Sequence, residues 1–310
     1  MKRWIWPALS LLCLLAACSA SGAGIQPAED PLSKAPERLE EANPVPAEGP
    51  QKEERAISYT VDMVNWEKNA LADDGARLVI SSLQLPELTA WRADGTAVLE
   101  PEVPEEERAA AVAAAFNERF EDWAAAREFQ EYADLAQEHF NMNRADGLNW
   151  TPYTLRMDSS VYQTDRLVSV SATYSAYTGG AHPITWNLGW NFDLGTGAFF
   201  DVSILAEDGS AFLTAVKEEL LRQANTPRED GYVPARDYWE NYEDTMASWS
   251  SYAVSFDETG MTVTFSTYEL ASYANGPQVF ELPYEWLEPH LSRQGRLVLG
   301  LEEGEAAAPN

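Results

Sequence analysis

The histidines are the first residues to consider for chemistry, because imidazole is the side chain that most often serves as a general base or metal ligand near neutral pH. The sequence contains His139, His182 and His290, and their spacing matches no zinc-binding pattern. His182 follows Gly179-Gly180, a pair that can expose a side chain at a turn. Two interpretations stay open for it: bonding backbone groups across the turn, or contacting a ligand.

Other catalytic patterns are weak in this sequence. No Gly-x-Ser-x-Gly elbow is present, although a serine triad is defined by geometry rather than by spacing. Among 50 acidic residues some pair will lie at a glycosidase distance by chance, so paired carboxylates indicate little. No stretch has the alternating acidic ligands of a calcium loop. The sequence therefore predicts no catalytic residue, no metal site and no cofactor.

Aromatic side chains gather in one polar stretch, residues 232–252, where acidic residues lie between them. The rings singled out for binding are Tyr238, Trp239, Tyr242 and Trp249. Aromatic faces stack on sugars, and aromatic anchors beside carboxylates would suit a basic protein. The competing interpretation is that these rings pack the loop onto a sheet.

The thiol of Cys18 has the most specific local context. Lys2 and Arg3 precede an apolar run, Trp4–Ala17, of about 14 residues, whereas a spanning helix needs roughly 20. The run ends in Leu15-Ala-Ala-Cys18, which resembles the lipobox of bacterial lipoproteins. The sequence thus predicts a signal peptide over residues 1–17 and lipid attachment at Cys18. The alternative is an ordinary signal peptide in which Cys18 is incidental.

A lipid on Cys18 would hold the protein on the extracytoplasmic face of the cell membrane. A diacylglyceryl group carries two acyl chains, which suffice for stable anchoring where a single chain does not. Residues 18–55 are rich in Ala, Pro and Glu with few large apolar side chains, so we expect a disordered tether. Such a tether would reach roughly 35 Å.

The formal net charge of −29 limits the classes of partner. Nucleic acid is excluded, because its binding requires clustered Lys and Arg to neutralise phosphates. Cationic proteins or peptides and divalent metal ions are the natural partners of such a chain. Simple solubility is the competing explanation of the acidity.

The remaining chain alternates between strand-like and helix-like patterns. Strands are predicted over 57–63, 77–85 (ended by Pro86), 153–158, 167–177, 184–193, 252–256, 261–265 and 278–282. Helices are predicted over 105–140, broken once, over 210–223 and over 284–287. These patterns predict an α+β fold of antiparallel sheets with helices packed on one face.

Three ordered motifs in the second half carry a family resemblance. They are Tyr177-Thr-Gly-Gly-Ala-His182, Asn191-Phe-Asp-Leu-Gly-Thr-Gly197 and Tyr268-Glu-Leu-Ala-Ser-Tyr-Ala-Asn-Gly-Pro277. Together they resemble the C-terminal domain of RsiV-type anti-sigma factors, which also occurs in PdaC-type peptidoglycan deacetylases. The first half is more loosely similar to the partner domain found with it. The resemblance implies two consecutive subdomains, over 56–150 and 151–295, with a loose tail over 296–310.

What the resemblance implies for function is a binding or sensing module. The ligand of RsiV-type proteins is lysozyme, so lysozyme or another cationic wall-associated protein is the leading expectation. The binding candidates are Tyr177, Gly179, Gly180, His182, Tyr238, Trp239, Tyr242 and Trp249. The alternatives are a peptidoglycan-binding accessory module and, less favoured, a wall-polymer hydrolase or deacetylase.

Overall fold

The structure, a computed structural model, describes residues 57–124 and 127–302, without the side chains of 122–128. The predicted signal peptide (1–17), the tether (18–55) with Cys18, and residues 303–310 lie outside the described residues. Within the described part, no helix has both the length and the apolar character needed to cross a membrane.

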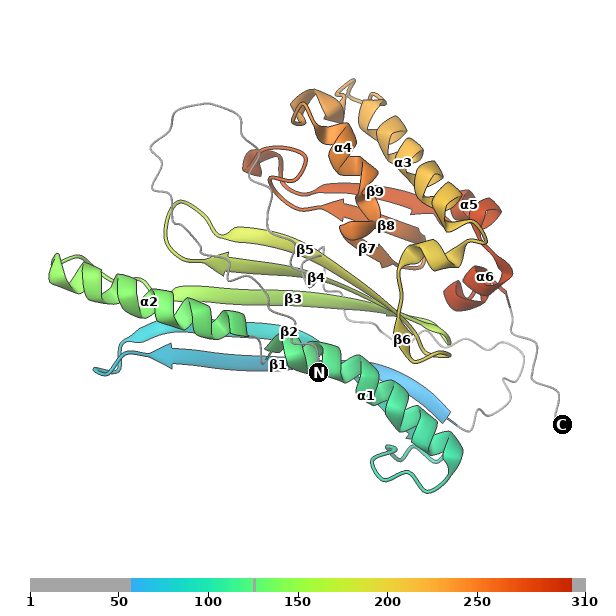
Figure 1. The fold of residues 1–310 in the computed structure, drawn as a ribbon, viewed down its shortest axis with the longest axis horizontal. Helices are drawn as coiled ribbons and strands as arrows, with labels where there is room; N and C mark the ends of the chain where they lie inside the picture. The colour runs from blue at the N-terminus through green and yellow to red at the C-terminus, as the bar shows by residue number, and fades with distance from the viewer. Residues whose placement is uncertain (1–56, 125–126, 303–310) are drawn as a thin grey trace, which may run out of the picture. The chain divides into compact units, whose positions relative to one another are not determined.

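A six-stranded sheet with the strands in sequence order forms the first layer (Figure 1). Neighbouring strands are antiparallel except β2 and β3, which run parallel because two helices connect them. The α+β class expected from the sequence is confirmed, with this one parallel pair added. The strands are β1 (Ile57–Leu71), β2 (Arg77–Arg92), β3 (Tyr153–Gln163), β4 (Leu167–Tyr177), β5 (Ile184–Asp193) and β6 (Ala198–Phe199).

The connecting helices α1 (Pro104–Ala124) and α2 (Arg127–Ala145) confirm the predicted helix with one break. Pro104 opens α1, and three glutamates follow in its first turn, where negative charge suits the helix dipole. The buried Phe116 of α1 packs edge-on against Phe192 of β5, with ring centroids 5.3 Å apart. The helices therefore cover one face of the sheet, as Figure 1 shows.

The sequence predicted that Pro86 would end β2, but this prediction is wrong. The strand continues through Pro86 to Arg92. The Leu88 N–H donates to Asn117 Oδ1 in α1 at 2.7 Å, and the Leu88 carbonyl accepts from the Asn117 amide nitrogen at 3.0 Å. The backbone N–H and C=O of Leu88 therefore point away from β1. The backbone of Pro86, two residues earlier, faces the same edge of β2. This is the edge that β3 pairs with, but the pairing ends at Leu83. The missing N–H of Pro86 costs no ladder hydrogen bond there.

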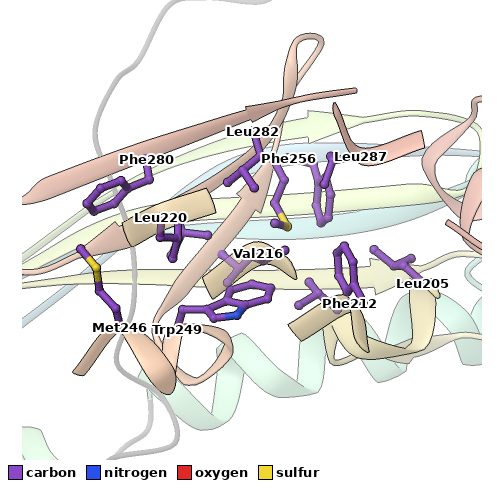
Figure 2. Close-up of a cluster of buried hydrophobic side chains, with 14 of the residues drawn as sticks. Leu205, Phe212, Val216, Leu220, Met246, Trp249, Phe256, Phe280, Leu282 and Leu287 are labelled. Atoms are coloured by element: carbon purple, nitrogen blue, oxygen red, sulfur yellow. The ribbon is translucent and has the colours of Figure 1, made fainter. Parts of the chain in front are cut away.

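A three-stranded antiparallel sheet makes up the second layer, in the order β7 (Ala253–Phe256), β8 (Gly260–Phe265), β9 (Gln278–Pro283). Helix α3 (Gly209–Asn225) packs on it through Phe212, Val216 and Leu220, which lie in a buried cluster with side chains of all three strands (Figure 2). The short helices α4 (Tyr242–Ala247), α5 (Tyr284–Leu287) and α6 (Arg293–Leu299) surround this core.

The two sheets are joined by side chains rather than by a continuous ladder. The Ser169 hydroxyl in β4 donates to Asn191 Oδ1 at 2.9 Å and accepts the Phe256 N–H at 2.7 Å. The Asn191 amide in turn donates to the Val254 carbonyl at 2.9 Å. Gly189 lets the backbones approach, since a Cβ there would lie 2.4 Å from the Val254 oxygen. Residue 189 must therefore be glycine for β5 and β7 to touch.

The motif that follows Asn191 is a structural lock at the end of β5. Asp193 is 3% exposed and accepts from the Arg166 guanidinium at 3.0–3.1 Å and from the Gly195 N–H at 2.8 Å. A Cβ on Gly195 would lie 2.4 Å from the guanidinium carbon, so this glycine makes room for the arginine. The buried carboxylate is thereby both paired and hydrogen-bonded, as a buried charge must be.

Two boundaries differ from the simple sequence pattern. The predicted subdomain boundary at residue 150 falls between α2 and β3, and hydrogen-bonded strands of one sheet lie on both sides of it. The loose tail was expected from residue 296, but α6 continues to Leu299. Val298 and Leu299 are each 2% exposed within the second core, and this burial holds the segment in place.

Replacing Ser169 with alanine should weaken the connection between the sheets. Phe256 N–H and Asn191 Oδ1 would both lose a partner in a buried position, so we expect a loss of about 1–3 kcal/mol. Urea unfolding would measure it. Ser175→Ala, on the same strand and partly exposed, should change stability by less than about 0.5 kcal/mol. Equal effects of the two variants would contradict the assigned role.

Glu106 predicts a pH-dependent stability. Hydrogen bonds from the Arg92 side chain and then from the Glu102 N–H lower the pKa of its carboxyl from the ordinary 4.5 to about 2. Its stabilising contribution should be complete above pH 4.5 and disappear as the pH falls through 2. The stability gap between the protein and Glu106→Gln, measured by denaturant unfolding, should therefore narrow over this range. A gap that is constant with pH would rule the contribution out.

Candidate functional site

Four side chains from three segments meet at the surface, and we call them the aromatic cluster: His182, Trp239, Tyr268 and Tyr273. His182 follows β4, Trp239 follows the 3₁₀ turn η2 (Pro234–Asp237), and the two tyrosines belong to the β8–β9 connection. The His182 and Tyr273 rings are stacked, with centroids 3.6 Å apart and planes at 11°. Trp239 is 43% and Tyr268 50% exposed, so much of the cluster faces solvent.

Tyr268 is the connecting residue of the cluster. Its hydroxyl lies 3.3 Å from His182 Nε2, and its carbonyl accepts the Trp239 indole N–H at 3.2 Å. His182 Nδ1 lies 2.9 Å from the Pro183 carbonyl, which can only accept, so Nδ1 carries a proton. Nε2 is the ring nitrogen that faces the Tyr268 hydroxyl. This arrangement fixes the orientation of both rings.

The backbone of Tyr268 is strained. It has φ of 72°, and within the described chain it is the one non-glycine residue with positive φ. Such a conformation costs roughly 1–3 kcal/mol and persists only where the surroundings enforce it. Here Thr267 donates to the Thr185 carbonyl at 3.2 Å and Ser266 accepts the Asn187 N–H at 2.9 Å. These bonds pin the loop to β5.

Asp237 holds the remaining loop in place. Its carboxylate accepts from the Tyr232 hydroxyl at 2.8 Å and from the Asn275 amide at 3.1 Å, which connects η2 to the turn that carries Tyr273. The hydrogen bond to Asp237 raises the pKa of Tyr232, so its phenol keeps the proton that it donates. The backbone N–H of Trp239 donates to the Leu270 carbonyl at 2.8 Å. The cluster is thus built before any ligand arrives.

The structure brings together one part of the predicted binding residues. Tyr177, Gly179 and Gly180 form the turn before His182, where the Tyr177 hydroxyl donates to the Gly180 carbonyl at 3.2 Å. Both glycines have positive φ, 102° and 97°, and no other group lies within 4 Å of the place of a Cβ. The turn therefore leaves open space beside the cluster.

Tyr238 and Tyr242, which flank Trp239 in the sequence, are turned toward the second core. The Tyr238 hydroxyl donates to Gln278 Oε1 at 2.9 Å, and burial raises its pKa to about 12. Its ring lies 5.6 Å from that of Tyr242, and both pack against the second core. These two rings therefore attach the loop to the second core.

Trp249 is wrong as a binding candidate. It is 0% exposed, its indole N–H donates to the Leu213 carbonyl at 2.9 Å, and it lies in the core beside Phe212 (Figure 2). The packing interpretation holds for this ring. Tyr268 and Tyr273 were absent from the binding candidates, although both stand in the family-like motif 268–277. Their position could have been suspected from that motif, but not the left-handed backbone.

Cavities offer no better candidate than this surface. Two shallow hollows measure about 240 and 250 Å³, below the roughly 300 Å³ at which ligand pockets usually begin. One lies beside Gly189 and Val254 where the sheets join, and the other beside Asp208 and His290. In residues 57–124 and 127–302, no three His, Asp or Glu side chains gather as metal ligands would.

Two family models match consecutive parts of the chain. The family model described as deacetylase PdaC matches residues 99–185, and that of DUF3298, a protein of unknown function, matches residues 204–285. Two consecutive segments of the chain are therefore similar to a PdaC domain and a DUF3298 domain in tandem, as the sequence resemblance predicted. His182 belongs to the first match, whereas Trp239, Tyr268 and Tyr273 belong to the second. The aromatic cluster thus draws on both domains.

One solved structure shares the fold, and a second is less similar. A DUF3298-family member from Bacteroides fragilis has a TM-score of 0.51 at 16% identity, covering 78% of this chain and 97% of that chain. A DUF3298-family protein from Pseudomonas aeruginosa PAO1 has a TM-score of 0.45 at 14% identity, with 77% and 96% covered. The likeness to the first structure concerns the fold alone. No curated protein matches the sequence.

Two tryptophans in one stretch should behave oppositely when truncated. Trp249→Ala would leave a cavity in the second core and lose the bond to Leu213, so we expect about 3–5 kcal/mol of destabilisation. Trp239→Ala removes a largely exposed ring and should cost less than about 1 kcal/mol. Urea unfolding of both variants, followed by circular dichroism, tests this. A cost for Trp239→Ala as large as that for Trp249→Ala would show that the cluster is structural.

Proposed function

We propose that this chain is a lipid-anchored protein of the cell envelope whose folded part is a non-enzymatic binding module. The ligand that we propose is a cationic protein of the wall, with lysozyme as the first to test. The aromatic cluster is the observation that carries the proposal, because it presents rigid, exposed rings that need no reordering on binding. Pre-organised aromatic anchors of this kind dominate the affinity of protein interfaces.

The charge of the chain favours a cationic ligand over a neutral one. The net charge is −29, and Asp237, Glu240 and Glu269 are sequence neighbours of the rings in the cluster. An Arg or Lys side chain placed over Trp239 or Tyr268 would combine a cation–π contact with attraction to these carboxylates. The same charge would speed the encounter with a basic protein at low salt.

The location rests on the Cys18 motif and supports the same function. A lipid at Cys18 followed by a tether would place the module outside the membrane, where wall enzymes and their inhibitors meet. One matched family is described as a deacetylase, and wall-polymer deacetylation or hydrolysis is the enzymatic alternative. That alternative predicts turnover of peptidoglycan fragments that is lost in His182→Ala.

The binding test uses full-length chain in detergent and immobilised lysozyme. Trp239→Ala and Tyr268→Ala should each weaken binding by at least about tenfold, the loss expected of a central anchor. Leu99→Ala, at a position 83% exposed in a different loop, should have no effect. Raising the salt from low to physiological concentration should weaken binding as charges are screened.

Cytochrome c serves as the control for charge alone. Equal retention of cytochrome c, or lysozyme binding that is unchanged in both ring variants, would refute specific capture through the cluster. The glycan alternative gives a different pattern, because rings also stack on sugars. It predicts retention on purified peptidoglycan that is lost in Trp239→Ala, insensitive to salt and unchanged in Glu240→Gln.

A further inference from the structure

The outer edge of β1 is a long surface on which one outward-pointing backbone group has a recorded partner: near the start of the strand, the Tyr59 carbonyl accepts from the Gln163 amide of β3 at 2.8 Å. β1 lies at the end of the six-stranded sheet, and in the described part of the chain no strand pairs with its outer edge (Figure 1). The strand has 15 residues, and Val64 is 41% exposed at its centre. An exposed edge of this length is a template for pairing with another strand, so it requires an explanation.

The direction of its backbone groups follows from β2. Both backbone groups of Leu88 bond Asn117, so Val61, the residue opposite Leu88, forms no backbone hydrogen bond with it. The backbone N–H and C=O of Val61 therefore point away from β2. Directions alternate along a strand, so Met63, Asn65, Glu67 and Asn69 also point outward. Any strand that joins this edge must bond these odd-numbered residues.

A second copy of β1 fits this edge when it runs antiparallel about a two-fold axis at Asn65. In that register Asn65 bonds its own counterpart, Met63 meets Glu67 and Val61 meets Asn69. All of these are outward-pointing residues, as the ladder requires. The even-numbered side chains then face each other in close pairs, Asp62 with Lys68 and Val64 with Trp66.

These facing pairs are complementary in charge and in polarity. Each Asp62 would lie opposite a Lys68, twice by symmetry. Val64 would cover Trp66, whose ring already packs edge-on against Phe129 of α2 at 6.5 Å. Lys68 lies over the Phe129 ring, with Nζ 4.4 Å from its centroid, which holds its stem on the same face. The apolar layer under α2 would thus continue from one copy into the next.

We propose that two copies of this chain associate through β1, antiparallel about Asn65, and form one continuous twelve-stranded sheet. The observation that favours a second copy over a foreign strand is this self-complementarity. If the partner strand moved by one residue along the edge, outward-pointing backbone groups would lie opposite groups that point toward β2. If it moved by two residues, Asp62 would no longer lie opposite Lys68. The dimer is independent of what the aromatic cluster binds.

Charge exchange tests the register with full-length chain in detergent. Light scattering after size exclusion should give a dimer for the unmodified chain at micromolar concentration. Lys68→Glu and Asp62→Lys each place like charges opposite one another twice, so each should raise the dissociation constant by at least about tenfold. An equimolar mixture of the two variants should form a heterodimer, because every facing pair is then opposite in charge. The double variant D62K/K68E should dimerise by itself.

Asn65→Pro provides a second, independent test. The outward N–H of residue 65 takes no part in the monomer, so proline should leave the fold intact while it removes both central hydrogen bonds of the dimer. Asn65→Thr is the matched control and should remain dimeric. A monomeric unmodified chain, or single charge variants as dimeric as the double variant, would overturn the proposal. Circular dichroism confirms that each variant is folded.

Discussion

The approach of β5 to β7 at Gly189 is the contact on which the rest of the structure depends. No backbone ladder joins the two sheets, so their relation is set by one missing side chain and by the Ser169–Asn191 pair that satisfies the buried groups beside it. Hydrogen bonds buried away from water are costly to leave unmade, which makes this junction specific as well as cohesive. A bulkier residue at 189 would push the second sheet away from the first.

The aromatic cluster is a consequence of that junction. The loop that carries Tyr268 is pinned to β5 by Ser266 and Thr267, and it reaches β5 only because the second sheet lies against the first. His182 lies in the connection between β4 and β5 of the first sheet and contacts the loop through Tyr268 and Tyr273. Strain at Tyr268 is tolerated because bonds on both sides enforce it. The surface is therefore held both by its attachment to β5 and by the contacts among its own rings.

Local pattern predicted most of the elements. The predicted strands 167–177 and 184–193 and the short helix 284–287 coincide with β4, β5 and α5, because alternation and turn residues are local properties. Pairing is not local, so the sheet that crosses residue 150 and the parallel β2–β3 pair could not be seen. The continuation of β2 through Pro86 depended on where β3 leaves β2, which is a tertiary fact.

The site was predictable in part for the same reason. His182 and Trp239 stand in short segments rich in glycine or aromatic residues, and such segments indicate a turn or a surface. Nothing in the sequence separated Trp239 from Trp249, since both are aromatic residues in an acidic stretch. Only the core around Phe212 decides that Trp249 turns inward. Tyr273 becomes significant only through its stack on His182.

The ion pair of Arg166 with Asp193, completed by the Gly195 N–H, shows what kind of similarity the family motif represents. The residues that made the second half recognisable at positions 191–197 close a β-hairpin and neutralise a buried charge, so they describe architecture. A chain can keep this lock and still present other side chains at positions 182, 239, 268 and 273. Shared motifs of this kind transfer the scaffold from one protein to another, while the identity of the ligand has to be established for each chain separately.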